Sequence, residues 1–133
     1  MLSGHFFLVV IIIAIVVVFI QWFFTGFLFH KYQALTPSVW RKENNLSYLA
    51  STLLALFFAF MFTLIFSLWK NRNSSMDSMN GIEFGFMCWL TFSIPIEIGN
   101  TIYINYSRMF VVGKCISSLF EYLIAGVVAS KMI

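Results

Sequence analysis

Apolar residues along the chain fall into four long runs, separated by short polar stretches. The runs cover about residues 6–29, 46–69, 81–104 and 110–133. A helix needs about 20 predominantly apolar residues to cross roughly 30 Å of hydrocarbon, and each run has that length. The pattern predicts an all-α fold: an integral membrane four-helix bundle with short loops, in which residues 1–133 form a single transmembrane domain.

The composition supports this prediction by excluding a soluble globular domain and a disordered chain. The chain is 61% hydrophobic and 20% aromatic, and only 10% of its residues are charged. Soluble domains are about 45–50% apolar and about 25% charged, so this chain lacks the charge that would cover a water-facing surface. Its aromatic content also excludes intrinsic disorder.

The third run is the least apolar, because it contains Glu83, Pro95, Glu97 and Asn100. A central charge costs about 2.5–3.5 kcal/mol on insertion scales, whereas each large apolar residue returns about 0.3–0.6 kcal/mol. The apolar residues of the run offset one glutamate, so we expect it to insert together with its neighbours. Pro95 has no N–H to donate to the carbonyl of Thr91, which predicts a kink or an opening of the helix there.

The connections between the runs are short. The longest covers residues 30–45, where Thr36 followed by Pro37 predicts one short helical turn; a plain connecting loop is the alternative. Residues 71–80 read as a polar turn.

The basic residues indicate an orientation. The first and third connections carry five Lys and Arg, against three for the second connection and the C-terminal tail. By the positive-inside rule, this count favours both termini outside the cell membrane and on the same side of it. Because the basic residues border the apolar runs, we expect membrane lipids as partners and no nucleic acid.

Small residues recur every four positions in the second run. They are Ser47, Ser51, Ala55, Ala59, Thr63 and Ser67. Such rows let helix backbones approach closely in lipid, so we expect this face to pack against another helix. A four-residue step drifts by about 40° on an α-helix, which favours a right-handed crossing centred near Ala55 and Ala59.

The third run carries a row with the same spacing, which begins with a GxxxG pattern and becomes polar toward its end. Its members are Gly81, Gly85, Trp89, Ser93, Glu97 and Thr101, and Asn100 follows Glu97 by about one turn. The two glycines indicate helix packing. A carboxylate inside a membrane span, beside a kink, predicts a ligand- or proton-binding site made by Trp89, Ser93, Glu97, Asn100 and Thr101. The alternative is a Glu97 near the head groups, hydrogen-bonded to Asn100 and Thr101 on a packing face.

The fourth run contributes a second candidate, Glu121, within the row Gly113, Ser117, Glu121, Ala125 and Ala129. If Glu97 and Glu121 share the bundle interior, a pair of carboxylates would suit proton-coupled binding. The alternative is a structural ion pair between Glu121 and Lys114. In the first run, Gln21 and Thr25 are the deep polar side chains, and we expect them to form interhelical hydrogen bonds.

Motifs for catalysis, metal binding or redox chemistry are missing from the sequence. The two cysteines, Cys88 and Cys115, lie apart within apolar runs and read as small buried side chains. No CxxC or HxxxH pattern, phosphate-binding glycine loop or nucleophile–base constellation occurs. We therefore expect no metal and no cofactor, and an enzyme is disfavoured.

The third run and the first connection carry a resemblance to a known family. The residues are Gly81, Gly85, Trp89, Phe92, Asn100 and Tyr103, preceded by Trp22, Gly26, Lys31, Trp40 and Arg41. In this arrangement the chain resembles a family of small prokaryotic four-pass membrane proteins catalogued as a domain of unknown function. The resemblance implies four spans over most of the chain and brings no activity with it.

Three functional hypotheses follow. The first is a binding or transport-type bundle whose third and fourth spans line a small polar pocket for a solute, a proton or a lipid. The second is a non-catalytic accessory or scaffold subunit that joins a homo-oligomer or a larger membrane partner through its small-residue rows. The third is a membrane-embedded enzyme acting on a lipid or a quinone.

Overall fold

The computed structural model describes residues 2–72 and 78–133, and within these ranges the chain is helical, without strands. The elements are α1 (Gly4–Gln21) with a π-helical continuation (Trp22–Leu28), α2 (His30–Gln33), a 3₁₀ turn (Pro37–Val39), α3 (Asn45–Lys70), α4 (Ser78–Cys88), a π-helical segment (Trp89–Ser93), α5 (Ile94–Tyr103) and α6 (Arg108–Met132). Four continuous helical stretches are long and apolar enough to cross a membrane: Gly4–Leu28, Asn45–Lys70, Asn80–Tyr103 and Arg108–Met132. The predicted all-α fold is confirmed. Residues 73–77 of the expected polar turn lie outside the described residues.

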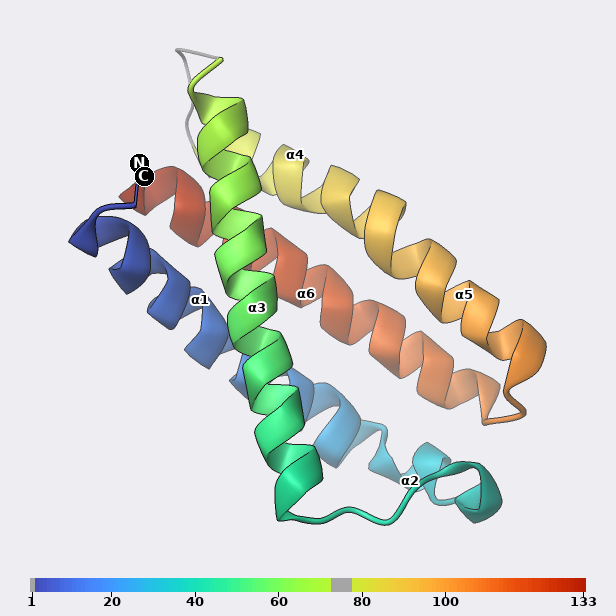
Figure 1. Cartoon of the computed structure of the whole chain (residues 1–133). Coiled ribbons are helices and arrows are strands. Elements are labelled where there is room, and N and C mark those ends of the chain that lie inside the picture. Colours follow the sequence, from blue (N-terminus) through green and yellow to red (C-terminus); the bar gives the residue numbers. More distant parts are fainter. Residues whose placement is uncertain (1, 73–77) are drawn as a thin grey trace.

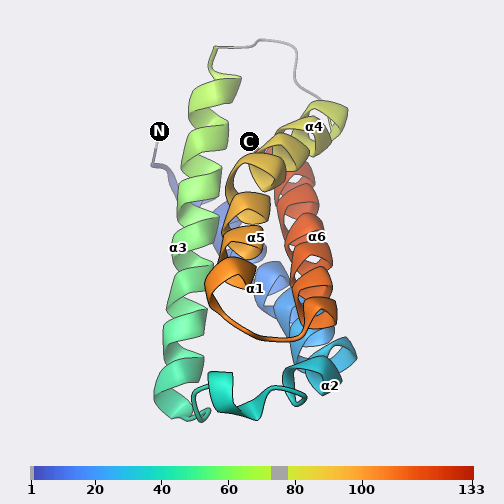
Figure 2. The ribbon, with the colours of Figure 1, turned by 90° about the vertical axis from the view of Figure 1, so that its right-hand side faces the viewer.

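Helix α6 has neighbours on both sides (Figures 1 and 2). Helix α1 lies along one side of it, α4 and α5 lie along the other, and α3 crosses over α1. The two ends of the chain lie together (Figure 1), where the His5 imidazole is hydrogen-bonded to the carbonyl oxygen of Met132.

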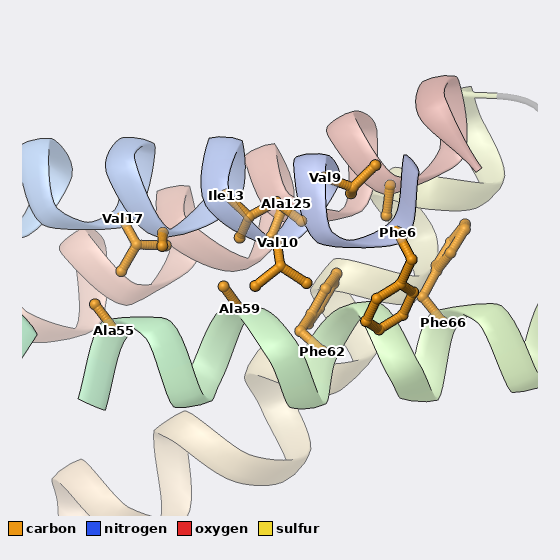
Figure 3. Packing of buried hydrophobic residues seen from close by; sticks show 12 residues of the cluster. Phe6, Val9, Val10, Ile13, Val17, Ala55, Ala59, Phe62, Phe66 and Ala125 are labelled. Atoms are coloured by element: carbon orange, nitrogen blue, oxygen red, sulfur yellow. The ribbon is translucent and has the colours of Figure 1, made fainter. Parts of the chain in front are cut away.

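The apolar core lies mainly between α1 and α3 (Figure 3). Val17 and Val10 of α1 point toward Ala55 and Ala59 of α3, and Ile13 lies beside Ala125 of α6. Both alanines of α3 are buried, so the missing side-chain volume on α3 is filled by the branched side chains of α1. The contact therefore pairs small residues with large ones.

The small-residue row of α3 is only partly in this contact. Ala55, Ala59, Thr63 and Ser67 are buried, whereas Ser51 is exposed and its hydroxyl donates to the carbonyl of Tyr48 in the same helix. The assignment of Ser51 to helix packing therefore stays a prediction, and within the described part of this chain Ser51 packs against no other helix. The reason is that residues 45–54 of α3 are all exposed, beyond the buried part of the crossing.

Helices α4 and α6 meet backbone to backbone. A Cβ atom added at Gly81 would overlap the carbonyl oxygen of Gly126, and one added at Gly85 would overlap that of Tyr122. The glycines of α4 thus allow an approach that any side chain would block. On α6, Ala125 belongs to the core with α1 and α3, and its neighbour Gly126 faces α4.

The expected disturbance before Pro95 takes the form of a π-helical segment, Trp89–Ser93. The N–H of Ile94 donates to the carbonyl of Trp89, five residues earlier. A π turn takes more residues than the 3.6 of an α turn, so a four-residue step that overshoots on an α-helix falls short there. The segment therefore cancels part of the drift and keeps Trp89, Ser93 and Glu97 on the side of α6 that Gly81 and Gly85 also face.

The first connection contains the predicted helical turn as the 3₁₀ turn Pro37–Val39, with Thr36 at its start. Trp40 then stacks on Tyr106, with ring centroids 5.5 Å apart, and meets Phe110 edge-on at 4.8 Å. Since Tyr106 lies between α5 and α6, this aromatic cluster ties the first connection to the third.

Candidate functional site: a polar cavity inside the bundle

Polar side chains from α1, α5 and α6 line a cavity of about 330 Å³ within the bundle. Its lining residues are Gln21, Thr25, Glu97, Lys114, Ser117, Ser118 and Glu121. At a rise of 1.5 Å per residue, Glu97 lies about 9 Å from the end of α5 and Glu121 about 20 Å from the start of α6. The cavity thus extends from the end that carries the first connection to the middle of the bundle.

Glu97 and Lys114 form an ion pair across α5 and α6. The ammonium Nζ lies 3.3 Å from Oε1, and the side chains are 12% (Glu97) and 35% (Lys114) exposed. The second carboxylate oxygen of Glu97 is buried and has no hydrogen-bond partner in residues 2–72 and 78–133. The hydrogen bond of this acceptor is therefore not made within the described residues, although buried carboxylate oxygens ordinarily find a donor.

The alternative hydrogen bonds of Glu97 with Asn100 and Thr101 do not form. Thr101 is exposed, and its hydroxyl donates to the carbonyl of Ile98. The side chain of Asn100 is hydrogen-bonded to the phenol of Tyr106. Neither residue lines the cavities beside Glu97, whereas Ser93, Glu97 and Glu121 do, and Trp89 contacts the lining residue Ser118.

Glu121 is the most enclosed carboxylate of the cavity. The hydroxyl of Ser117 donates to its Oε1 at 3.0 Å, and the amide of Gln21 donates to its Oε2 at 3.4 Å. The expected interhelical role of Gln21 is thus a bond to α6. The ion pair that we considered between Lys114 and Glu121 gives way to the one with Glu97, which faces Lys114 from the neighbouring helix.

Trp89 and Ser93 fix the π-helical segment to α6. The indole N–H of Trp89 lies 3.0 Å from the hydroxyl of Ser118 and 3.1 Å from the carbonyl of Cys115. The hydroxyls of Ser93 and Ser118 are 2.7 Å apart. These bonds position the start of α5 and, with it, the carboxylate of Glu97. Both residues therefore have a positioning role.

A second polar cavity, of about 400 Å³, adjoins the first at the end that carries the first connection. It shares Thr25 and Lys114 with the first cavity and adds His30, Glu43 and Tyr48. The hydroxyl of Tyr48 donates to Glu43 at 2.6 Å. No spacing pattern in the sequence pointed to Glu43 and Tyr48, because they reach the cavity from the first connection and the start of α3.

Tyr106 closes the same end of the bundle. Burial raises the pKa of its phenol, the negative charge of Glu97 adds to this, and the hydrogen bond from Asn100 opposes it. The phenol therefore stays protonated over a wider pH range than a free tyrosine.

The ionisable groups of the main cavity are the carboxyl groups of Glu97 and Glu121 and the ammonium of Lys114. An additional cation, a proton or a neutral hydrogen-bond donor would complement the Glu97 carboxylate, whereas an anion would be repelled by it. No group of three or more His, Cys, Asp or Glu in the described part of the chain is placed to hold a metal ion.

Fold and cavity together define a class: a helical bundle with four helices of membrane-spanning length and a charged polar cavity in its interior. The chain belongs to the family described as Protein of unknown function (DUF1761), whose sequence profile matches residues 8–130. The resemblance found in the sequence is thereby confirmed. No curated protein matches the chain, and no solved structure does.

Proposed function

We propose that the chain is a multi-pass protein of the cell membrane that binds a small polar ligand, a proton or a lipid head group in the cavity between α1, α5 and α6, as a step of binding or transport. The observation that supports this proposal is the carboxylate of Glu97, a lining residue of the cavity, of which one oxygen pairs with Lys114 and the other is buried without a hydrogen-bond partner in the described residues. Ionisable groups within membrane spans are costly and rare, so where they occur they ordinarily mark a ligand site or a proton path.

Access to the cavity is expected from one side of the membrane. The second cavity leads from the first connection to Lys114, whereas the opposite end is filled by aromatic rings and by the contact of α4 with α6. The positive-inside count favours the first connection inside and both termini outside. Reporter fusions at the two termini test this orientation, and reporters on opposite sides, or both on the inside, would contradict it.

Proton flux in reconstituted vesicles tests the cavity itself. We expect Glu97→Gln and Glu121→Gln to change the flux of protons, or the stabilisation of the protein by small cationic solutes, while the fold is kept. The matched control is Glu83→Gln, since Glu83 is exposed on α4 and lies outside the cavity. If both cavity variants behave like the control in both measurements, the proposal is wrong.

An accessory role in a larger complex is the second candidate. Residues 45–54 of α3 present an exposed apolar surface that includes Leu49, Leu53 and Leu54. A membrane partner or a second copy of the chain could cover it. Co-purification of a stoichiometric partner in mild detergent would support this role, and a monomer free of partners would count against it.

A further inference from the structure

An apolar groove opens between α3 and α4, on the side of the bundle away from α1. It has a volume of about 460 Å³, and its wall includes Leu54, Phe62, Ile65, Phe84, Cys88 and Phe92. Along α3 it extends from Leu54 to Ile65, about 16 Å at 1.5 Å per residue, which is close to the depth of one leaflet of the hydrocarbon core. Leu54 is strongly exposed, so the groove is open to the side from which lipid would enter.

The groove continues into a smaller space of about 230 Å³ that reaches the polar residues. Leu54, Phe92 and Tyr122 belong to the walls of both. The smaller space is also lined by Glu97 and Glu121. The apolar groove is therefore continuous with the space lined by the two glutamates, and Phe92 and Tyr122 lie where the two meet.

The polar end sets limits on what can bind. The small space lies well below the end of α5, so a bulky phospholipid head group would have to be buried among helices. Glu97 and Glu121 line this space and Lys114 does not, and one oxygen of the Glu97 carboxylate has no hydrogen-bond donor in the described residues. A head group that donates hydrogen bonds matches this chemistry, and a carboxylate or phosphate head group does not.

We propose that this continuous groove and cavity bind a single-chain amphiphile with a small hydrogen-bond-donating head group, a long-chain alcohol or amine. Its chain lies in the groove between α3 and α4, and its head group donates to Glu97. The inference rests on the proposed function, because it takes the cavity as the ligand site, and it names the ligand class.

Occupancy of the groove can be measured by chemical labelling of Cys88, because Cys88 is in its wall and the chain has only one other cysteine, Cys115. In a Cys115→Ser background, the full chain in phosphatidylcholine vesicles is labelled with N-ethylmaleimide in the presence of hexadecanol, hexadecylamine or hexadecanoate. We expect the alcohol and the amine to slow the labelling of Cys88 and hexadecanoate to leave it unchanged. A Cys88→Ala background reports Cys115, which is not in the groove wall, and none of the three compounds should protect it.

The head-group contact is tested by Glu97→Gln in the same background. Loss of a charge-assisted hydrogen bond should raise the amount of amine needed for half protection about tenfold or more. Glu83→Gln serves as the matched control and should leave that amount unchanged.

Three results would overturn the inference. They are equal protection by all three compounds, absence of protection by any of them, and full protection by the amine in Glu97→Gln. If proton flux or stabilisation by solutes still depends on Glu97, the proposed function is retained although the amphiphile proposal is wrong. Failure of the amphiphile proposal can therefore be distinguished from failure of the proposed function. If the amphiphiles protect Cys88 but neither proton flux nor stabilisation by solutes depends on Glu97, the amphiphile site is supported and the proton or solute role is wrong.

Discussion

Gly81 of α4 and Gly126 of α6 touch through their backbones, with no side chain between them. The contact lies at the end of α4 opposite the cavity, and it sets how closely the two helices run together. Because α4 continues through the π-helical segment into α5, the same spacing governs whether Ser93 can reach Ser118 across the gap. A packing feature thereby determines the position of the polar site.

Adding one methyl group at Gly126 should loosen this contact. In Gly126→Ala the new Cβ would overlap the carbonyl oxygen of Gly81, so one helix must shift. We expect a loss of about 1–3 kcal/mol in the free energy of unfolding, as for other overpacked interiors. Unfolding in mixed micelles, followed by circular dichroism, measures it.

Gly99→Ala is the matched control, because no heavy atom lies within 4 Å of a Cβ placed there. Helix propensity alone should make this variant equal to the parent or up to about 1 kcal/mol more stable. Equal stability of Gly126→Ala and Gly99→Ala would contradict the close contact.

The ion pair between Lys114 and Glu97 should show coupling in a double-mutant cycle. Lys114→Met leaves the Glu97 carboxylate in the cavity wall without its cation and should cost about 1–3 kcal/mol. Adding Glu97→Gln removes the isolated charge and should recover part of that loss. Strictly additive effects of the two substitutions on the unfolding free energy would show that the pair does not interact.

The crossing of α1 and α3 predicts different outcomes for two positions in one row of α3. Ala59→Leu inserts a large side chain where the site is fully buried, so we expect a loss of about 1–3 kcal/mol. Ser51→Leu places the same side chain at an exposed position and should be tolerated. Thermal melts of the two variants decide the matter, and an intolerant Ser51 would mean that a further helix covers that part of α3.

Tyr106 should make the stability of the protein fall at alkaline pH. Since burial and Glu97 raise the pKa of its phenol above 10.0, the unfolded chain releases this proton at a lower pH than the folded chain does. The contribution is complete below pH 10.0 and is lost as pH rises through the folded pKa. Comparing melts of Tyr106→Phe and the parent above and below that pH tests this, and the variant should lose less stability.

Tyr103→Phe is the matched control for the loss of a phenol hydroxyl, because Tyr103 is almost fully exposed at the end of α5. Its alkaline stability profile should match that of the parent. If the profile of Tyr106→Phe also matches that of the parent, the folded state does not stabilise the protonated phenol of Tyr106.

Much of this arrangement could be predicted from the sequence, because length and hydropathy alone define helices that can cross a membrane. The four runs correspond to Gly4–Leu28, Asn45–Lys70, Asn80–Tyr103 and Arg108–Met132. The opening before Pro95 followed from its missing N–H, a local property. The sequence could not decide whether Glu97 and Glu121 share the bundle interior, and in the structure both line one cavity.

What could not be predicted depends on how helices are rotated about their axes. The four-residue row along α6 contains Ala125 and Ala129, which are buried in the core. The contact with α4 is made by Gly126, which is not in that row. Lys114 could reach a carboxylate on its own helix or on a neighbour, and only the rotation of α5 decides for Glu97. Glu43 joins the neighbouring cavity through the path of the first connection, which has no periodicity to read.

The wide turn at Trp89–Ser93 makes the effect of a one-residue deletion depend on where it falls. The wide turn takes up one extra residue over nearly the same rotation as an α turn, so deleting one of the five and restoring ordinary helical winding would leave Glu97 on the side that faces α6. Deleting one residue from the regular winding of α5 before Glu97 would instead swing Glu97 by about 100°, although composition, hydropathy and span length would hardly change. Within the family, a one-residue gap at 89–93 should therefore be found in members that keep the carboxylate in the cavity, and a gap in the stretch that follows should not.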